Sequence, residues 1–349
     1  MEALTFNLKQ HKGKLRYNAD FPKAQIQNPD DVLIQVAYAG VCGTDLHIME
    51  GHFPCKPDGD VVLGHEFSGR VVAIGAQVTN VKVGDQVSVD PNQGCMVCGD
   101  CRYGNVHYCR DGGLNNTVGI YRNGGFAQFV VVPDVQVHKL PSELSLMQGA
   151  LTEPLSCIVH GWDKLQPIPV GKKILILGAG IIGNLWISIL QGQGHRKITM
   201  SEVNKSRLDH IQKYFSGVEC VTPDQLLKRV DNEESFDLVI DCSGNGKAIE
   251  QGVSVLKTGG TMCIFGVASP ETRISIAPYE LFAKELTIMG VKINPFTFPK
   301  ALGLMQSLCD QFLVYEKLGI KVFKLSEFEK AIEDLKKGTI AKAMFHVGL

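Results

Sequence analysis

The amino-acid sequence predicts an α/β protein with a β-rich N-terminal domain and a second domain built on a doubly wound parallel sheet. Its 349 residues exceed what one hydrophobic core usually serves, which favours two domains. The first ~150 residues carry short β segments that are interrupted by glycine and proline. After Pro154 short apolar strands alternate with longer helical stretches, a pattern typical of a parallel sheet covered by helices.

The strands expected in the N-terminal domain are apolar or alternating, and each is bounded by Gly, Asp, Asn or Pro. They cover residues 32–36, 69–74, 86–89 and 126–132. This pattern indicates a partly antiparallel, barrel-like domain whose loops carry the functional residues.

The second domain shows a regular alternation of elements. Strands are expected at residues 174–177, 197–201, 238–241, 261–265 and 288–291, and helices at 205–215 and 247–256. Near the C-terminus, residues 326–337 predict an amphipathic helix with Phe328, Ile332 and Leu335 on one face.

Charge and hydropathy exclude two kinds of partner. The 35 basic and 36 acidic residues give a net charge of -1, without the basic excess that nucleic-acid binding calls for. Residues 174–190 are apolar enough to suggest a membrane span, but Gly178, Gly180 and Gly183 divide them into a strand, a turn and a helix. We therefore expect neither a nucleic acid nor a membrane as partner.

A cluster of four cysteines follows the third expected strand. Cys95, Cys98, Cys101 and Cys109 have the spacing C-x2-C-x2-C-x7-C, which suits a closed tetrahedral thiolate site for structural Zn²⁺. Two disulfides are the alternative. The odd total of 11 cysteines and a first segment without a secretory signal favour reduced thiols, and hence a cytoplasmic protein.

A second set of metal-ligand residue types lies upstream. Cys42 is in Val-Cys-Gly-Thr-Asp-Leu-His (41–47), and His65 and Glu66 are in Leu-Gly-His-Glu-Phe (63–67). Sulfur, nitrogen and oxygen donors together are typical of a catalytic zinc site that keeps one position open.

A dinucleotide-binding motif, G-x-G-x-x-G, follows the expected strand 174–177 and opens a helix. Its residues are Gly178, Ala179, Gly180, Ile181, Ile182 and Gly183. The glycines permit a tight turn that lets the backbone approach a pyrophosphate at the helix N-terminus. Glu202, at the end of the next strand, is placed to accept a hydrogen bond from a ribose 2′-hydroxyl, which favours NAD. Lys205 and Arg207 are the opposing candidates, because they could pair with the 2′-phosphate of NADP.

In this order the motifs resemble the zinc-dependent medium-chain dehydrogenases along essentially the whole chain. Residues 64–69, Gly-His-Glu-Phe-Ser-Gly, with Gly75 beyond, are similar to the family's zinc signature. Residues 152–156, Thr-Glu-Pro-Leu-Ser, resemble the polyol branch, of the sorbitol and arabinitol type. The resemblance implies a GroES-like catalytic domain with the zinc lobe at residues 1–155 and a Rossmann domain at 156–294. It also implies a C-terminal segment, 295–349, that returns to the first domain.

The resemblance also implies roles for single residues. Cys42, His65 and Glu153 become ligands of the catalytic zinc, with Cys157 as a rival for the third position. Glu66 either binds the ion or leaves it for water or substrate. Thr44 and His47 stand at the positions of the family's proton relay. The remaining residues implied at the cofactor are Ser243, Gly266, Val267 and Lys342.

The expected activity is hydride transfer between a polyol or sugar-alcohol hydroxyl and NAD, by a homodimer or homotetramer. An alcohol dehydrogenase for aryl, allylic or terpenoid alcohols is the alternative, since Phe53, Ile120, Tyr121 and Phe296 are candidates to line an aromatic pocket. A non-catalytic protein that binds zinc and a dinucleotide is a third hypothesis, disfavoured by the complete set of candidate catalytic residues.

Overall fold

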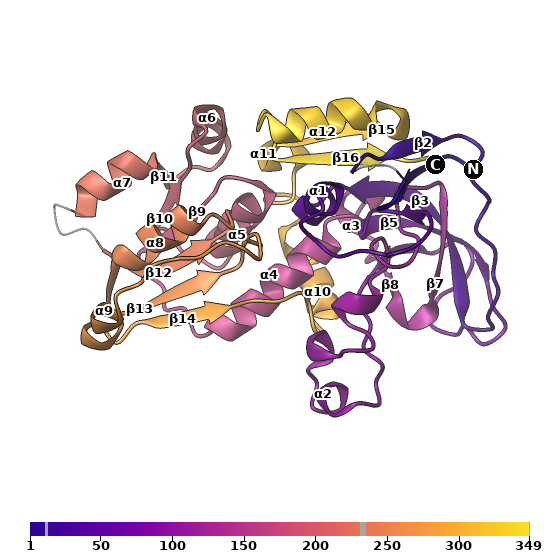
Figure 1. The fold of residues 1–349 in the computed structure, drawn as a ribbon, viewed down its shortest axis with the longest axis horizontal. Coiled ribbons are helices and arrows are strands. Elements are labelled where there is room, and N and C mark those ends of the chain that lie inside the picture. Colours follow the sequence, from indigo (N-terminus) through magenta and orange to yellow (C-terminus); the bar gives the residue numbers. More distant parts are fainter. Residues whose placement is uncertain (11–12, 231–234, 349) are drawn as a thin grey trace.

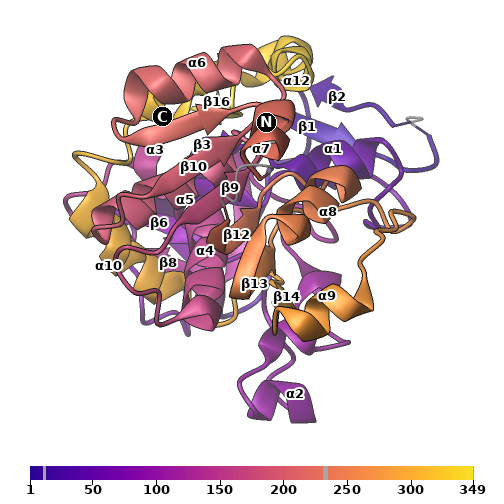
Figure 2. The same cartoon turned by 90° about the vertical axis from the view of Figure 1, so that its left-hand side faces the viewer.

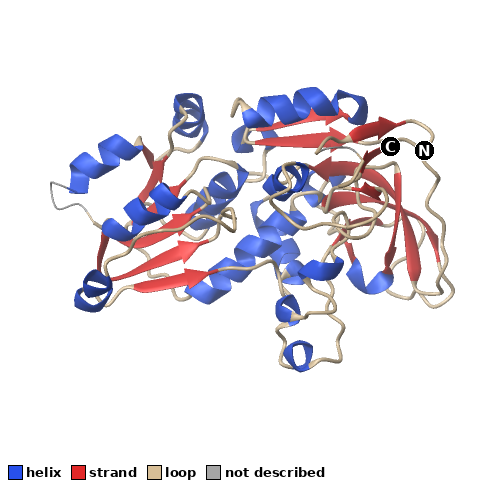
Figure 3. Cartoon of the chain, in the orientation of Figure 1, coloured by secondary structure: helices blue, strands red, loops and turns tan. Residues whose placement is uncertain are grey.

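The computed structural model describes residues 1–10, 13–230 and 235–348. Two sheet-based units lie side by side, and helices α4 (Thr152–Leu165) and α10 (Phe298–Leu308) lie between them (Figure 1). One unit has helices around its sheet, whereas the other consists mostly of strands and loops (Figure 3). The predicted α/β class is confirmed. Among the described residues, no helix has the length and apolar character that crossing a bilayer requires.

The β-rich unit contains two sheets. In the described part of the chain the larger sheet has the order β15-β16-β3-β5-β6-β8, with β7 paired to β3, and the smaller has the order β2-β1-β4. The strands of the larger sheet are β3 (Asp31–Gly40), β5 (Glu66–Ile74), β6 (Gln86–Val89), β7 (Phe129–Pro133), β8 (Val137–Lys139), β15 (Ile320–Lys324) and β16 (Lys342–His346). The smaller sheet consists of β1 (Ala3–Phe6), β2 (Arg16–Asn18) and β4 (Val61–Val62).

The long antiparallel pair β3–β5 forms the centre of this unit. Val32, Ile34 and Val36 of β3 alternate into the core and are completely buried. The register shifts between Val36 and Tyr38, where the strands approach closely. A Cβ on Gly69 of β5 would lie 2.2 Å from the carbonyl oxygen of Gln35, so only glycine fits there.

The C-terminal segment divides between the two units. β16 pairs antiparallel with β3 and returns the chain to the β-rich unit, as expected. Within this segment, β15 is the first described strand that joins the sheet of the β-rich unit. Helix α10 instead packs against α4, because its apolar residues Phe298, Ala301 and Met305 belong to the same core cluster as the parallel sheet. The predicted boundaries after residues 155 and 294 remain predictions.

The second unit is a six-stranded parallel sheet in the described residues, with the order β11-β10-β9-β12-β13-β14. Its strands are β9 (Ile174–Leu177), β10 (Ile198–Ser201), β11 (Val218–Val221), β12 (Phe236–Asp241), β13 (Leu256–Ile264) and β14 (Thr287–Gly290). Its helices include α5 (Ile181–Gly192), α6 (Lys205–Tyr214), α7 (Pro223–Val230) and α8 (Gly246–Ser254). The order reverses beside β9, and ligands of such sheets bind at the carboxyl ends of the strands near this reversal.

Strand β9 shows why the sheet is covered on both faces. Ile174 and Ile176 point into the core cluster that includes α5, whereas Leu175 and Leu177 point into the cluster that includes α8. Figure 2 shows α5 and α8 on opposite sides of the strands. Burial on both faces explains the continuous apolar run that the sequence shows here.

The predicted strands agree with the structure best where the apolar pattern is cleanest. The strands at 86–89 and 174–177 have the predicted limits. The strand predicted at 261–265 begins five residues earlier, at Leu256. Gly259 and Gly260 carry no side chain to show the alternation, which is why the sequence pattern missed this part.

The remaining helices are short. The α-helices are α1 (Gly43–Met49), α2 (Gly99–Arg102), α3 (Leu146–Gly149), α9 (Pro278–Ala283), α11 (Tyr315–Leu318) and α12 (Phe328–Lys336). The 3₁₀-helices are η1 (Val106–Tyr108), η2 (Leu114–Asn116), η3 (Asp134–Gln136) and η4 (Leu325–Glu327). Helix α12 confirms the amphipathic helix predicted at 326–337; its Ile332 is buried, and Phe328 and Leu335 pack partly buried on the same core.

Candidate active site

The four-cysteine cluster forms a lobe that projects from the β-rich unit around α2 (Figure 1). The sulfur atoms of Cys95, Cys98, Cys101 and Cys109 all lie within 4.8 Å of one another, and all are free thiols. Backbone N–H groups of Cys95 and Cys98 donate to sulfurs of the cluster at 3.3 Å. Hydrogen bonds from the backbone N–H groups of Val97 and Cys98 lower the pKa of the Cys95 thiol to about 7, which favours the thiolate that a metal requires.

A second donor group joins two loops of the β-rich unit. Cys42 precedes α1, while His65 and Glu66 lie at the start of β5. One ligand atom from each lies within 4.8 Å of the other two. The structure thus brings the Cys42 thiol to an imidazole and a carboxylate that lie more than twenty residues later in the sequence.

Asp45 lies behind this group. Its Oδ2 accepts a hydrogen bond from the backbone N–H of Cys42 at 2.8 Å, and its Oδ1 lies 3.7 Å from Nδ1 of His65. Oδ1 of Asp45 and Nδ1 of His65 are both buried, and neither has a hydrogen-bond partner among the described residues. A carboxylate beside the second nitrogen of an imidazole is typical of histidines that ligate metals, which supports a role for Asp45 in orienting His65.

Lys342 lies in the same buried region, which the sequence alone did not indicate. Its side chain is 1% exposed; its ammonium contacts Oε2 of Glu66 and donates to the carbonyl oxygen of Val41 at 3.1 Å. Burial opposes the charge, but Glu66, Cys42 and Asp45 together outweigh it and hold the pKa of Lys342 above its usual range. Gly40 makes room, since a Cβ there would lie 2.5 Å from Glu66 and 2.6 Å from Lys342. The predicted contact of Lys342 with the cofactor remains a prediction.

Glu153 and Cys157 occupy adjacent turns on one side of α4. The Cys157 thiol lies 3.5 Å from Oε1 of Glu153. Burial raises the pKa of Glu153 to about 7, although the nearby His65 opposes this shift. Burial also raises the pKa of the Cys157 thiol, and the Glu153 carboxylate adds to the effect. Glu153 is thus close enough to His65 to influence it, but it lies outside the compact group formed with Cys42 and Glu66.

Thr44 and His47 lie one turn apart on α1, on the same side of the helix. Both are partly buried. This arrangement is compatible with the predicted relay, in which one group receives a proton and the other passes it to solvent.

The glycine motif forms the turn between β9 and α5. Gly178 has φ +101°, a left-handed conformation that favours glycine. A Cβ on Gly183 would lie 2.1 Å from the carbonyl oxygen of Gly178, so this glycine permits the close packing of helix and turn. Gly180 precedes the helix, with open space around its Cα, and Ile181 and Ile182 begin it. The turn has the form that exposes a helix N-terminus to a phosphate.

Glu202 braces this turn. Its Oε2 accepts a hydrogen bond from the backbone N–H of Ala179 at 2.8 Å, and its Oε1 accepts one from Asn204 at the same distance. Arg207 lies nearby, with Nη1 3.8 Å from Oε2 of Glu202, and also donates to the carbonyl oxygen of Gly338. The sequence predicts that Glu202 and Arg207 lie near the ribose of the bound dinucleotide. In the structure, Glu202 also stabilises the glycine turn through its hydrogen bond with Ala179.

The ends of β12 and β13 meet at the same edge of the sheet. Asp241 accepts hydrogen bonds from the backbone N–H and the hydroxyl of Ser243, at 2.9 and 2.6 Å. A Cβ on Gly266 would lie 2.2 Å from the nitrogen of Gly244, so the two turns touch. Val267 is 54% exposed beside them. The structure therefore brings Ser243, Gly266 and Val267 together at the carboxyl end of the sheet.

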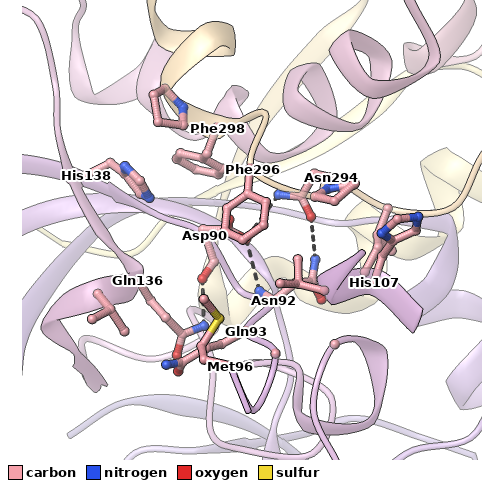
Figure 4. Close-up of a pocket in the computed structure, with 17 residues that line it drawn as sticks. Asp90, Asn92, Gln93, Met96, His107, Gln136, His138, Asn294, Phe296 and Phe298 are labelled. Carbon is pink, nitrogen blue, oxygen red and sulfur yellow. Dashed lines mark hydrogen bonds between the residues drawn. The ribbon is translucent and has the colours of Figure 1, made fainter. Parts of the chain in front are cut away.

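A cavity of about 400 Å³ lies between the cysteine lobe and the loop after β14 (Figure 4). Asn294 donates to Oδ1 of Asp90 at 3.0 Å and accepts from Asn92 at 2.7 Å. Burial raises the pKa of Asp90 to about 7. No motif in the sequence indicated this polar network; the position of Asp90 at the end of a strand was the available signal.

Several residues that line the cavity have strained backbone conformations. Met96, Ile293 and Phe296 have φ of 61°, 43° and 54°, and they are three of the four non-glycine residues with positive φ in the described chain. Among the four aromatic-pocket candidates, Phe296 lines this cavity, whereas Ile120 is buried in the core of the β-rich unit.

Comparisons with known proteins agree with this geometry. Residues 28–142 match the alcohol dehydrogenase GroES-like domain, and residues 182–307 match the zinc-binding dehydrogenase domain. D-arabinitol dehydrogenase 1 of Uromyces fabae is 30% identical over 88% of this chain and 87% of its own length. D-altritol 5-dehydrogenase of Agrobacterium fabrum is 34% identical over 83% and 84%. The chain belongs to the zinc-dependent medium-chain dehydrogenase family.

The solved structures of the family show the same architecture. A zinc-binding dehydrogenase of Sinorhizobium meliloti, solved with NADP, has a TM-score of 0.86 and 29% identity over 99% of this chain and 100% of its own. The alcohol dehydrogenase of Thermus sp. ATN1 has a TM-score of 0.85 and 25% identity over 100% of each chain. The GroES-like and Rossmann units predicted from the resemblance are therefore confirmed as fold classes.

The donor atoms of this dehydrogenase fit zinc by their chemistry. The lobe offers four soft sulfur donors, and the Cys42 group offers sulfur, nitrogen and oxygen. If a divalent ion were bound by the Cys42 thiolate and the carboxylates of Glu66 and Glu153, the site as a whole would carry one excess negative charge. Lys342, in contact with Glu66, offsets it.

We predict two zinc ions per chain, which elemental analysis of the freshly purified protein would measure. Cys98→Ser should remove the lobe ion, leave one equivalent and lower the thermal midpoint, because structural zinc contributes folding free energy directly. Cys220→Ser is the matched control, since Cys220 is outside both donor groups. A Cys98→Ser protein that still holds two equivalents would contradict the assignment.

Proposed function

We propose that this dehydrogenase transfers a hydride between a polyol or sugar-alcohol hydroxyl and NAD. The observation that carries the proposal is the convergence of Cys42, His65 and Glu66 beside Glu153, in one buried site of a fold that also carries the dinucleotide turn. The relatives named for arabinitol and altritol, and probable D-xylulose reductase A of Aspergillus clavatus at 32% identity, support a polyol.

We assign Cys42, His65 and Glu153 as ligands of the catalytic zinc, with Glu66 as an exchangeable neighbour. When bound, zinc supplies a Lewis acid that lowers the pKa of an alcohol, and the nicotinamide supplies the hydride acceptor. Asp45 orients His65, and Lys342 holds Glu66 through their buried ion pair.

The chain's own residues handle the proton. We assign the Thr44 hydroxyl as the group that accepts the proton from the substrate hydroxyl, and His47, one turn later on α1, as the group that releases it to solvent. In the second unit, the turn at Gly178, Gly180 and Gly183 offers backbone N–H groups to the pyrophosphate. Ser243, Gly266, Val267 and Lys342 are assigned to the remaining cofactor contacts.

A substrate panel tests the proposal. NADH formation at 340 nm is measured with pentitols, hexitols and aryl alcohols, and the highest kcat/KM is expected for a polyol.

Thr44→Ala should keep both zinc ions and lose nearly all turnover, because the substrate proton loses its first acceptor. Highest activity on aryl alcohols would select the alternative substrate class; normal kcat in Thr44→Ala would refute the relay.

NAD is expected to be preferred over NADP. A carboxylate at Glu202 accepts from a 2′-hydroxyl and repels a 2′-phosphate. Arg207, 3.8 Å from Glu202, is the competing feature. The ratio of kcat/KM for the two cofactors measures the preference, where tenfold corresponds to about 1.4 kcal/mol. Glu202→Gln, which keeps the size of the side chain, should reduce the preference for NAD, mainly by raising kcat/KM with NADP. An unchanged preference would show that Glu202 stabilises the glycine turn and does not select the cofactor.

We also propose a cytoplasmic homodimer or homotetramer. Eleven free cysteines support a reducing compartment. Strand β14 is an edge of the parallel sheet, and the neighbouring α9 exposes Tyr279 and Phe282 at 77% and 78%. Uncovered edges and exposed aromatic side chains favour pairing with a second copy.

A further inference from the structure

The C-terminal end of α1 carries three metal-ligand side chains outside the two sites described above. His47, Glu50 and His52 each offer one ligand atom, and these atoms all lie within 4.8 Å of one another. His47 is the relay residue of the proposed function, whereas Glu50 and His52 have no role there. The side chains of Glu50 and His52 are 41% and 56% exposed, so a dissolved ion can reach them.

The geometry of the helix end explains why these side chains meet. Gly51 has φ +75° and follows the helix as its left-handed terminating residue. Its N–H donates to the carbonyl oxygen of Ile48 at 3.0 Å, and the N–H of His52 donates to that of His47 at 2.8 Å. This pair of bonds is the Schellman motif, which folds the residue after the glycine back over the last helical turn. In this motif the residue after the glycine commonly makes an apolar contact with the residue that accepts its hydrogen bond. Here these two residues are His52 and His47, and Glu50 lies between them in the sequence.

The chemistry of this cluster suits a borderline divalent cation. Two imidazoles and a carboxylate are preferred ligands of Zn²⁺, Ni²⁺ and Cu²⁺. The end of a helix carries partial negative charge, which favours a cation further. Nδ1 of His47 is buried and has no hydrogen-bond partner in the described part of the protein, so this histidine still has a nitrogen to engage.

We propose that His47, Glu50 and His52 form an inhibitory site for a divalent transition-metal ion. An ion held there would occupy the imidazole that releases the proton, and turnover would fall as the site fills. The binding site stands on the geometry alone; its inhibitory effect rests on the proposed function, in which His47 is the last group of the relay.

Lys336 provides the competing interaction. Its ammonium lies 2.9 Å from Oε1 of Glu50, and Oε2 of the same carboxylate lies 3.7 Å from Nδ1 of His52. A metal ion and this ammonium would therefore share one carboxylate. Removing the lysine charge should tighten metal binding, while removing the histidine should weaken it.

The test is equilibrium dialysis of the zinc-loaded protein against NiCl₂, with nickel and zinc both measured by elemental analysis. The wild type should take up one nickel without losing zinc. His52→Ala should weaken nickel binding by at least about tenfold, because even the loss of a group that only supports a ligand costs about 10–100-fold in metal affinity, and Lys336→Gln should strengthen nickel binding. His346→Ala, which removes an exposed histidine on β16, is the matched control and should change nothing.

Turnover is measured on the same samples. Nickel should inhibit the wild type, and His52→Ala should keep the basal rate and require at least about tenfold more nickel for the same inhibition. Equal nickel binding by wild type and His52→Ala would overturn the site. Nickel binding at this site with unchanged turnover would overturn the inhibition. An enzyme without polyol activity would refute the proposed function and leave the dialysis result decisive for the site.

Discussion

Glu153→Ala is expected to deplete the catalytic zinc and to remove most of kcat, while the lobe zinc stays bound. The reason is the position of this side chain at the start of α4, buried and close enough to His65 for each to affect the other's pKa. An imidazole and a thiolate alone hold zinc poorly, and a third protein ligand is typical of catalytic sites. Zinc content and kcat of the same preparation measure the effect.

Cys157→Ala is the matched comparison, because this thiol is one turn away and contacts the same carboxylate. Burial and Glu153 raise the pKa of Cys157 and keep its thiol protonated, which disfavours it as a ligand. Its removal should cost only packing, about 1 kcal/mol of unfolding free energy, with zinc and kcat retained. The reverse pattern, with zinc lost from Cys157→Ala and kept by Glu153→Ala, would transfer the ligand role to the cysteine.

Lys342→Met is expected to lower the unfolding free energy of the zinc-free protein by about 3–5 kcal/mol. The lysine and Glu66 are 1% and 2% exposed and pair with each other, so the substitution leaves a buried carboxylate uncompensated. Denaturant unfolding in the presence of a chelator measures the loss. With zinc restored the loss should shrink, because the ion gives Glu66 a second positive partner.

Two further variants separate this pair from ordinary surface charge. Lys336→Met breaks an exposed ion pair with Glu50 and should change stability by no more than about 1 kcal/mol. Adding Glu66→Gln to Lys342→Met should recover part of the loss, since the unpaired charge is then gone. A Lys342→Met protein as stable as the wild type would show that Glu66 does not depend on this lysine.

The sequence alone was sufficient wherever the determining residues are neighbours in the chain. The spacing of Cys95, Cys98, Cys101 and Cys109 predicts the thiolate lobe because a short loop must bring such residues together. The glycine turn at residues 178–183 was predictable for the same reason, since its conformation depends on local glycines. Strands such as β9 followed from a continuous apolar run, which is the pattern of burial on both faces.

Only the tertiary structure decided which distant residues share one environment. Pairing of β16 with β3 places Lys342 against Glu66, and no local pattern in either segment indicates that contact. Helix α10 packs against α4 and the core of the parallel sheet, a match of apolar surfaces that no spacing in the sequence records. The sequence by itself determined the fold class, the metal-ligand residue types and the dinucleotide turn. The charge balance and neighbours of the catalytic site depend on long-range strand pairing and packing.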